Sequence, residues 1–351
     1  MICTVARIRS RRRRRSDSSR ERRPHSAILV AGYAYLSWRL TSSAPARLAL
    51  AVPFLLIWIV PVIYWIEGRE STHWTDEVLH GLCYICMGWL NFLFVLSVGR
   101  DGLILVTAIP ALSAVHDLLR DAGATWVFLG SLGALGAGVL AALRGPHVRH
   151  VDVPVEGLAP DLDGFRIVQI SDLHIGPTIR RGYVRRVVDM TNELAPDLIA
   201  LTGDIVDGPV PRLARHVAPV AELAQGGRAF LVLGNHDYYA GAGPWVAQFE
   251  SMGLRVLLNS HISVAPGAAR LIVGGVIDPA ARAVDIEARP RPDLASAIDA
   301  GVAFRLLLAH NPKIAPLAES AGFDLQLSGH THGDQTNVRA TAVSRLGLSE
   351  G

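Results

Sequence analysis

Long apolar segments, crowded into residues 26–143, constrain the fold of this chain more than any other feature. They are segments 26–40, 46–66, 78–98, 102–115 and 124–143. An α-helix needs roughly 20 apolar residues to cross the hydrocarbon core of a bilayer. The second, third and fifth segments reach that length, and the other two fall short of it. We therefore expect four or five transmembrane helices in an integral membrane protein.

Residues 1–24 contain ten arginines and few apolar residues, a composition typical of a disordered arm. Such an arm could bind anionic lipid or nucleic acid. We favour the simpler interpretation that its charge holds the N-terminus in the cytoplasm, and we expect no specific nucleic-acid partner. The basic cluster in 144–150 also prefers the cytoplasm, which gives four crossings, whereas the acidic loop 67–77 argues against that number. The side of the membrane that carries the catalytic domain stays open.

The few polar residues of the first half exclude some functions. We expect no paired charges within the apolar helices, and a transporter usually needs them. The three cysteines are Cys3, Cys83 and Cys86, so none lies in the second half of the chain. This spacing excludes a disulfide scaffold, and Cys83 with Cys86 supplies too few ligands for a zinc site.

The pattern of the sequence changes after residues 144–163, a linker with several prolines and glycines. In residues 164–351, short apolar runs alternate with helix-like stretches, which predicts an α/β domain with parallel strands. Five of the runs lead directly into polar residues, namely Asp172 and His174; Asp204 and Asp207; Asn235, His236 and Asp237; His310; and His330 and His332. Because ligands bind at the carboxyl ends of strands in open α/β sheets, we expect these residues to meet at one edge.

The kinds of residue at this edge indicate metal ions. Helix capping would explain an aspartate, but it does not require histidine at four strand ends. Carboxylate and imidazole ligands without thiolate suit Mn, Fe, Zn, Co or Ni. About eight such ligands suit two ions, roughly 3.5–4 Å apart, which make a nucleophile of water and hold the oxygens of a phosphoryl group. The cluster therefore predicts hydrolysis of a phosphate ester.

The motifs that carry these residues resemble a known family. DLH, GDIVD, GNHD, a histidine after a strand and GHTHG, in this order, are similar to the motifs of the calcineurin-like metallophosphoesterases. The resemblance covers roughly residues 164–335, and the apolar first half is similar in kind to the membrane-anchored branch of that family. It implies an α-helical transmembrane region followed by an α/β domain, a four-layer α/β/β/α sandwich, in residues 164–351.

The resemblance also implies a role for each residue of the motifs. One ion, with manganese among the candidates, would be held by Asp172, His174, Asp204 and His332. The other would be held by Asp204, Asn235, His310 and His330. A hydroxide that bridges the metals would be the nucleophile, His236 would protonate the leaving oxygen, and Asp207 would orient His236. For Asp278, a contact with substrate and a plain turn position stay equally open.

These features predict a membrane-bound dinuclear phosphohydrolase, in the bacterial plasma membrane, that acts as a phosphodiesterase or diphosphatase. Its phosphate-ester substrate could be lipid-linked, because the anchor would hold the site beside the bilayer; the oligomeric state stays open. The alternative is a non-catalytic metal-binding scaffold or sensor. Asp334 stands where the family has a second glycine, and the stretch 336–351 has little strand pattern. The second sheet would then lack strands, as in a C-terminally truncated domain.

Overall fold

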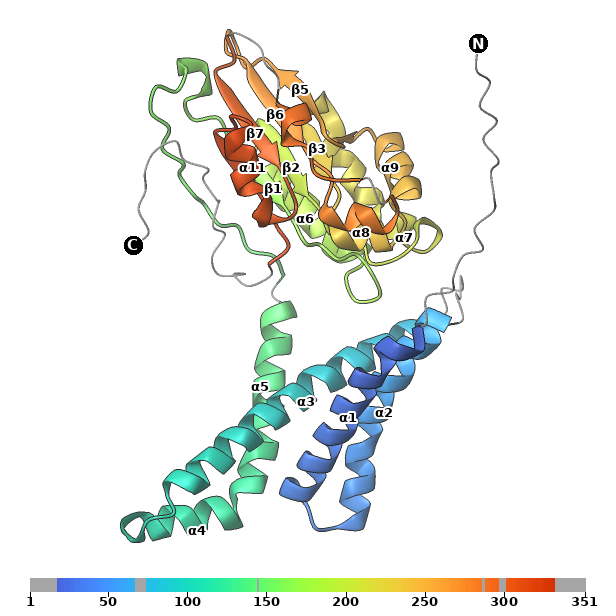
Figure 1. Cartoon of the computed structure of the whole chain (residues 1–351), viewed down its shortest axis with the longest axis vertical. Coiled ribbons are helices and arrows are strands. Elements are labelled where there is room, and N and C mark those ends of the chain that lie inside the picture. The colour runs from blue at the N-terminus through green and yellow to red at the C-terminus, as the bar shows by residue number, and fades with distance from the viewer. Residues whose placement is uncertain (1–17, 67–73, 144, 286–287, 297–300, 332–351) are drawn as a thin grey trace, which may run out of the picture. The chain divides into compact units, whose positions relative to one another are not determined.

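The computed structural model describes residues 18–66, 74–143, 145–285, 288–296 and 301–331 (Figure 1). The chain divides into two compact units, one of residues 1–69 with 78–142 and the other of residues 70–77 with 143–351. The first is a helical unit and the second is an α/β domain, and each is described by itself. Most of the arginine-rich arm lies outside the described residues, but from Ser18 onward it is helical, not irregular as expected.

Four long helices make up most of the helical unit: α1 (Ser18–Leu40), α2 (Ala44–Ile66), α3 (Trp74–Val106) and α5 (Gly123–Leu143). The apolar segment 102–115 does not form a helix of its own in this described part of the chain. Its first residues continue α3, and it then passes through a 3-10 turn, η1 (Pro110–Leu112), into the short helix α4 (Ser113–Asp121). Pro110 explains the break, because proline restricts the preceding residue to extended backbone, as found for Ile109.

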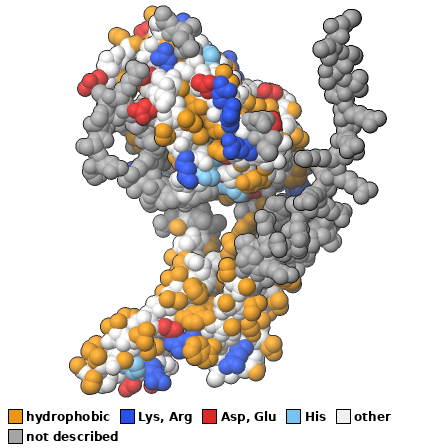
Figure 2. All heavy atoms as spheres, in the orientation of Figure 1, with side chains coloured by type: hydrophobic (Ala, Val, Ile, Leu, Met, Phe, Trp, Pro, Cys, Tyr) orange, Lys and Arg blue, Asp and Glu red, His pale blue; other side chains and the backbone are white. Residues whose placement is uncertain are grey.

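Apolar side chains cover the outside of the helical unit. Leu105 and Trp38 are 77% and 72% exposed, and Figure 2 shows hydrophobic side chains over most of the described surface of these helices. An exposed apolar surface of this extent marks an interaction site, and it fits contact with lipid. Residues Val78–Val106 and Gly123–Ala141 are long and apolar enough to cross a membrane, and Ala44–Trp58 is a shorter apolar helix. The number of crossings stays a prediction.

A network of charges joins α1 to α3. The guanidinium of Arg39 pairs with the carboxylate of Asp101, with Nε 2.7 Å from Oδ2, and the hydroxyl of Tyr35 donates to the same oxygen at 2.8 Å. Arg100 donates to Asp101 Oδ1 at 3.3 Å and to the backbone oxygen of Arg39 at 3.2 Å. Our expectation that these helices lack paired charges is therefore wrong, because the sequence does not show which positions of α1 and α3 are neighbours.

Two four-stranded sheets form the centre of the α/β domain. The first has the order β1 (Ile167–Ile170), β2 (Leu198–Thr202), β3 (Ala229–Val232) and β4 (Arg255–Val256), all parallel. The second has the order β5 (Ser260–Val264), β6 (Leu271–Gly275), β7 (Phe304–Leu308) and β8 (Leu325–Leu327), with β5 antiparallel and the others parallel. Six of these strands, all except β4 and β5, coincide with short apolar runs of the sequence, and five of the six are buried along most of their length.

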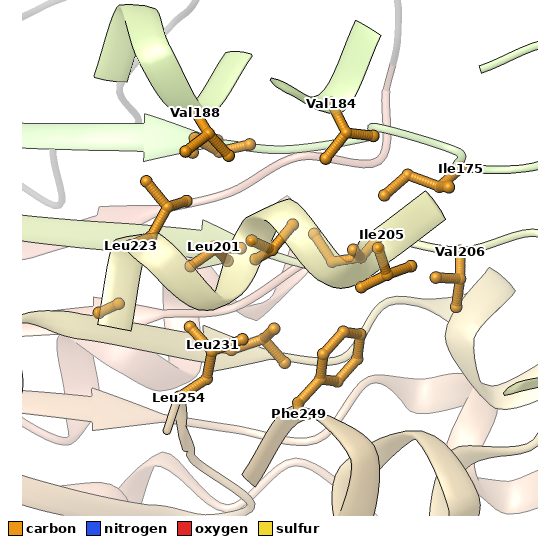
Figure 3. Packing of buried hydrophobic residues seen from close by; sticks show 14 of the residues in the cluster. Ile175, Val184, Val188, Leu201, Ile205, Val206, Leu223, Leu231, Phe249 and Leu254 are labelled. Atoms are coloured by element: carbon orange, nitrogen blue, oxygen red, sulfur yellow. The ribbon is translucent and has the colours of Figure 1, made fainter. Parts of the chain in front are cut away.

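Helices cover the outer face of each sheet, so the domain has four layers. The first sheet is covered by α6 (Arg181–Glu193), α7 (Val210–Val217), η3 (Ala218–Gly227) and α9 (Ala242–Ser251). The second is covered by α10 (Pro292–Ala295) and α11 (Ala315–Ser320). Strand residues alternate between the layers: Leu201 and Leu231 pack against the helices (Figure 3), whereas Ala200 and Phe230 pack against the second sheet. This alternation confirms the α/β/β/α sandwich.

Candidate functional site

The loops that follow β1 and β2 lie side by side. The backbone N–H groups of Asp172 and His174 donate to the carbonyl oxygens of Gly203 and Asp204, both at 3.0 Å. Glycine permits a third loop to come close: Gly203 has a φ of +89°, and a Cβ on it would lie 2.6 Å from the backbone nitrogen of Gly234, after β3. Three strand ends therefore meet at one edge, as the sequence predicts.

Backbone strain marks the same edge. Four predicted metal ligands, Asp172, His174, Asp204 and His330, have φ values of 55°, 47°, 52° and 76°. Among the residues that the structure describes, only two other non-glycine residues have positive φ, namely Ala195 and Asn259. Each such residue costs about 1–3 kcal/mol and persists only where its surroundings enforce it. Their concentration in these loops supports a functional site.

Asp204, His310 and His330 form one group, whose candidate ligand atoms all lie within 4.8 Å of one another. The buried His310 donates its Nδ1–H to the carbonyl oxygen of Thr202 at 2.8 Å, so the neutral ring carries no proton on Nε2. That Nε2 lies 3.2 Å from Asp204 Oδ2 and has no hydrogen-bond partner within the described part of the chain. Asn235 brings an oxygen to the same group, with its Oδ1 2.9 Å from His330 Nδ1.

Asp172, His174 and Asp204 form a second group, again with ligand atoms within 4.8 Å. The carboxylate of Asp172 is held by the hydroxyl of Ser171 at 2.6 Å and by the backbone N–H of His330 at 3.0 Å. His174 Nε2 lies 3.8 Å from Asp204 Oδ2. Asp204 therefore belongs to both groups. The remaining predicted ligand, His332, lies outside the described residues.

Asp207 lies between two histidines. Its Oδ1 is 2.8 Å from His236 Nδ1 and 2.9 Å from His174 Nδ1, and the two imidazole rings meet edge to face with centroids 4.5 Å apart. The predicted pairing of Asp207 with His236 is thus present in the structure. The contact with His174 was not predicted, because it depends on how the first two loops pack together.

The buried charges of the site stabilise one another. Burial alone would lower the pKa of His310, but its contact with Asp204 raises that pKa to about 8. Burial would likewise raise the pKa of Asp204, but its contact with His310 and a hydrogen bond from the backbone N–H of His236 hold that pKa below its usual value. The carboxylate of Asp204 therefore stays ionised and attracts positive charge.

These residues fit divalent metal ions on their chemistry. Metal-bound histidines commonly donate their second ring N–H to a backbone carbonyl, as His310 does to Thr202. Its other nitrogen is buried, points toward a carboxylate, and lacks a hydrogen bond among the described atoms. Imidazole nitrogens with carboxylate and amide oxygens suit Mn, Fe, Zn, Co or Ni.

The role of Asp237 was not predicted from the sequence. This fully buried residue accepts backbone N–H groups from Ile205 and Val206 on Oδ1, at 2.9 and 3.0 Å, and from Gly234 on Oδ2, at 2.8 Å. It lies in the short helix α8 (Asn235–Tyr239) and ties the loop after β3 to the loop after β2. An acidic residue three positions after a helix cap is a recognisable signal, but it predicts only the bond to Gly234.

Asp278 occupies a turn. It precedes the 3-10 helix η4 (Pro279–Ala283), and its Oδ1 accepts the N–H of Ala280 at 2.8 Å. This contact confirms the turn position, one of the two roles that we considered for it. A contact with substrate stays a prediction.

The α/β sandwich and the imidazole and carboxylate cluster at its strand ends define a class of protein, the metal-dependent hydrolases. Comparison with known proteins narrows this class. Residues 165–334 match the family described as calcineurin-like phosphoesterase. A "Transmembrane protein with metallophosphoesterase domain" from Danio rerio is 33% identical over 337 residues, which cover 88% of this chain and 75% of that protein. The chain belongs to the calcineurin-like phosphoesterase family and is a metallophosphoesterase.

Other relatives agree with this placement. The protein of the same name from Bos taurus is 30% identical and covers 85% of this chain and 68% of its own length. Among solved structures, a 5'-nucleotidase precursor from Thermus thermophilus matches with a TM-score of 0.33 and 18% identity, over 48% of this chain and 42% of that chain. Because the relatives include animal proteins, the bacterial plasma membrane stays a prediction.

Proposed function

We propose that this chain is a membrane-bound phosphohydrolase that holds two divalent metal ions and cleaves a phosphodiester or a diphosphate. The observation that carries the proposal is the position of Asp204. Its Oδ2 lies 3.2 Å from His310 Nε2 and 3.8 Å from His174 Nε2, so one carboxylate stands between two sets of candidate ligands. One ion would need only one of these sets.

The residues of the two groups would hold the ions. Asp172, His174 and Asp204, with His332, are proposed for one, and Asp204, Asn235, His310 and His330 for the other. When bound, ions of this kind lower the pKa of water toward neutrality and stabilise the charge of a phosphoryl group. Asp204 would be shared, as its membership of both groups supports.

His236 is proposed to give a proton to the leaving oxygen. Its side chain is 44% exposed, so a substrate can reach it. Asp207 accepts the Nδ1–H at 2.8 Å, which fixes the ring and assigns the transferable proton to Nε2.

Tyr239 supports a substrate whose leaving group carries apolar surface. Its ring is 63% exposed, and its centroid lies 5.9 Å from that of His236. A group whose oxygen takes a proton from His236 would pass beside this ring and gain contact with it. Because the same chain carries an apolar helical unit, a lipid-linked phosphate ester is the substrate class that we favour.

The test is hydrolysis of bis(p-nitrophenyl) phosphate and p-nitrophenyl phosphate by the full chain in detergent. Each would be measured with added manganese and with chelator, for wild type, His236→Ala and Asp204→Asn. His261→Ala is a matched control, because His261 is exposed on β5, the edge strand of the second sheet, which carries none of the predicted site residues. We expect metal-dependent turnover, faster for the diester, that both site variants lose and the control keeps.

The result that would refute the proposal is folded, metal-loaded protein that hydrolyses neither compound and none of a set of lipid phosphates. A metal-binding scaffold would then describe the chain better. Turnover that survives in Asp204→Asn would instead refute the shared role of Asp204.

A further inference from the structure

We propose that Asp207 positions the metal ligand His174 as well as the general acid His236, so that one carboxylate orients both halves of the site. This inference rests on the proposed metal site. The inference adds to the proposed function, because a residue that oriented only the general acid would have no effect on metal binding.

The contacts of Asp207 carry the inference. The Nδ1 atoms of His174 and His236 lie 2.9 and 2.8 Å from the same oxygen, Oδ1. In a neutral ring, an Nδ1–H that donates to a carboxylate leaves the second nitrogen, Nε2, without a proton, so Nε2 can bind a metal ion. For His174 that nitrogen lies on the side of Asp204, 3.8 Å from its Oδ2. Asp207 therefore selects the tautomer with which His174 can bind a cation.

The backbone holds Asp207 in place beside His174. Its N–H donates to the carbonyl oxygen of Ile175 at 3.0 Å, and the N–H of Ile175 donates to Ile205 at 2.9 Å. Ile175 also pairs with Val206 in a short parallel bridge, and both side chains are fully buried. Backbone hydrogen bonds thus join the loops after β1 and β2, and they hold the side chains of Asp207 and His174 next to each other.

The shared carboxylate orients both imidazoles. Their rings meet edge to face, with centroids 4.5 Å apart and an interplanar angle of 87°. Loss of the shared oxygen would release both rings at once. The ring of His236 is half-exposed and would turn into solvent, whereas His174 would lose the bond that orients its Nε2.

Metal affinity separates the two roles of Asp207. Manganese would be titrated into metal-free full chain in detergent, in competition with a fluorescent chelator, for wild type, Asp207→Ala, Asp207→Asn and His236→Ala. We expect wild type to bind two ions. Asp207→Ala should bind one of them about 10- to 100-fold more weakly, the effect typical of losing a residue that orients a ligand. His236→Ala should keep wild-type affinity for both.

The conservative variant tests the hydrogen bond itself. Asn keeps an oxygen that can accept from both Nδ1 atoms, so Asp207→Asn should recover most of the lost affinity. The inference is overturned if Asp207→Ala binds both ions like wild type, if it loses both equally as in a collapsed site, or if His236→Ala weakens binding as much. If wild type itself binds fewer than two ions, the proposed function fails first.

Discussion

Replacing Asp237 with asparagine should loosen the connection between two loops of the site without removing a predicted ligand. The native carboxylate accepts three backbone N–H groups inside the protein. An asparagine oxygen could keep Ile205 and Val206, but the amide NH₂ would then face the N–H of Gly234. The loss of one hydrogen bond, with a buried donor left unsatisfied, costs about 1–3 kcal/mol.

Thermal unfolding measures this cost. For a domain of this size, each kcal/mol shifts the unfolding temperature by about 2–4 °C, so Asp237→Asn should unfold about 2–12 °C below wild type when both are measured below pH 7. Asp189→Asn makes the same substitution at an exposed position on α6 and should change little. Equal unfolding temperatures for wild type and Asp237→Asn would show that these bonds contribute nothing.

The pH dependence gives a second measurement of the same residue. Burial raises the pKa of Asp237 to about 7, against the effect of its backbone donors. Because this folded-state pKa lies above the unfolded value of 3.8, the protonated group contributes stability that is full below pH 3.8 and lost as pH rises through about 7. The stability gap between metal-free wild type and Asp237→Asn should therefore narrow over that range. A gap that widens as pH rises would refute a raised pKa for Asp237 in the folded state.

Three further changes test other parts of the structure. Gly203→Ala should abolish turnover, because its Cβ would lie 2.7 Å from His310 Nδ1; Gly226→Ala, with nothing within 4 Å of its Cβ, should keep it. Tyr239→Ala should raise the KM for bis(p-nitrophenyl) phosphate about 2- to 10-fold, whereas Tyr239→Phe should not, and equal values would remove the ring from substrate binding. Asp101→Leu should destabilise the helical unit by about 1–3 kcal/mol, because it leaves Arg39 without its carboxylate partner. The cost is smaller than for a fully buried pair, since the side chains of Asp101 and Arg39 are 23% and 26% exposed. Melting curves in detergent should show that the double variant Arg39→Leu/Asp101→Leu recovers part of the lost stability. An Asp101→Leu variant as stable as wild type would contradict this role of the ion pair.

The sequence predicts much of the α/β domain, because parallel strands buried on both faces are continuous apolar runs. Runs such as "LIALT" and "FRLLL" correspond directly to β2 and β7. β5 is different: only alternate residues of "SHISV" are shielded, and its pairing with β6 is a tertiary property. The apolar segment 102–115 misleads because hydropathy alone does not register the break at Pro110.

In the candidate site, too, some features could be predicted from the sequence and others depend on tertiary packing. Polar residues at strand ends are visible in the sequence, so Asp204 and His310 could be expected to meet. The second contact of Asp207 and the bonds of Asp237 to Ile205 and Val206 could not, because they depend on the spacing between neighbouring loops. Local patterns name the residues of the site, and the packing of the loops decides which atoms they share.

The left-handed backbone of Asp172, His174, Asp204 and His330 has a consequence for how relatives diverge. A lineage that gave up the reaction would no longer need side chains at these positions, and glycine there would relax the loops and stabilise the fold. Glycine or asparagine at several of the four positions would therefore be a signature of a descendant that has lost its chemistry. This chain carries aspartate or histidine at all four positions.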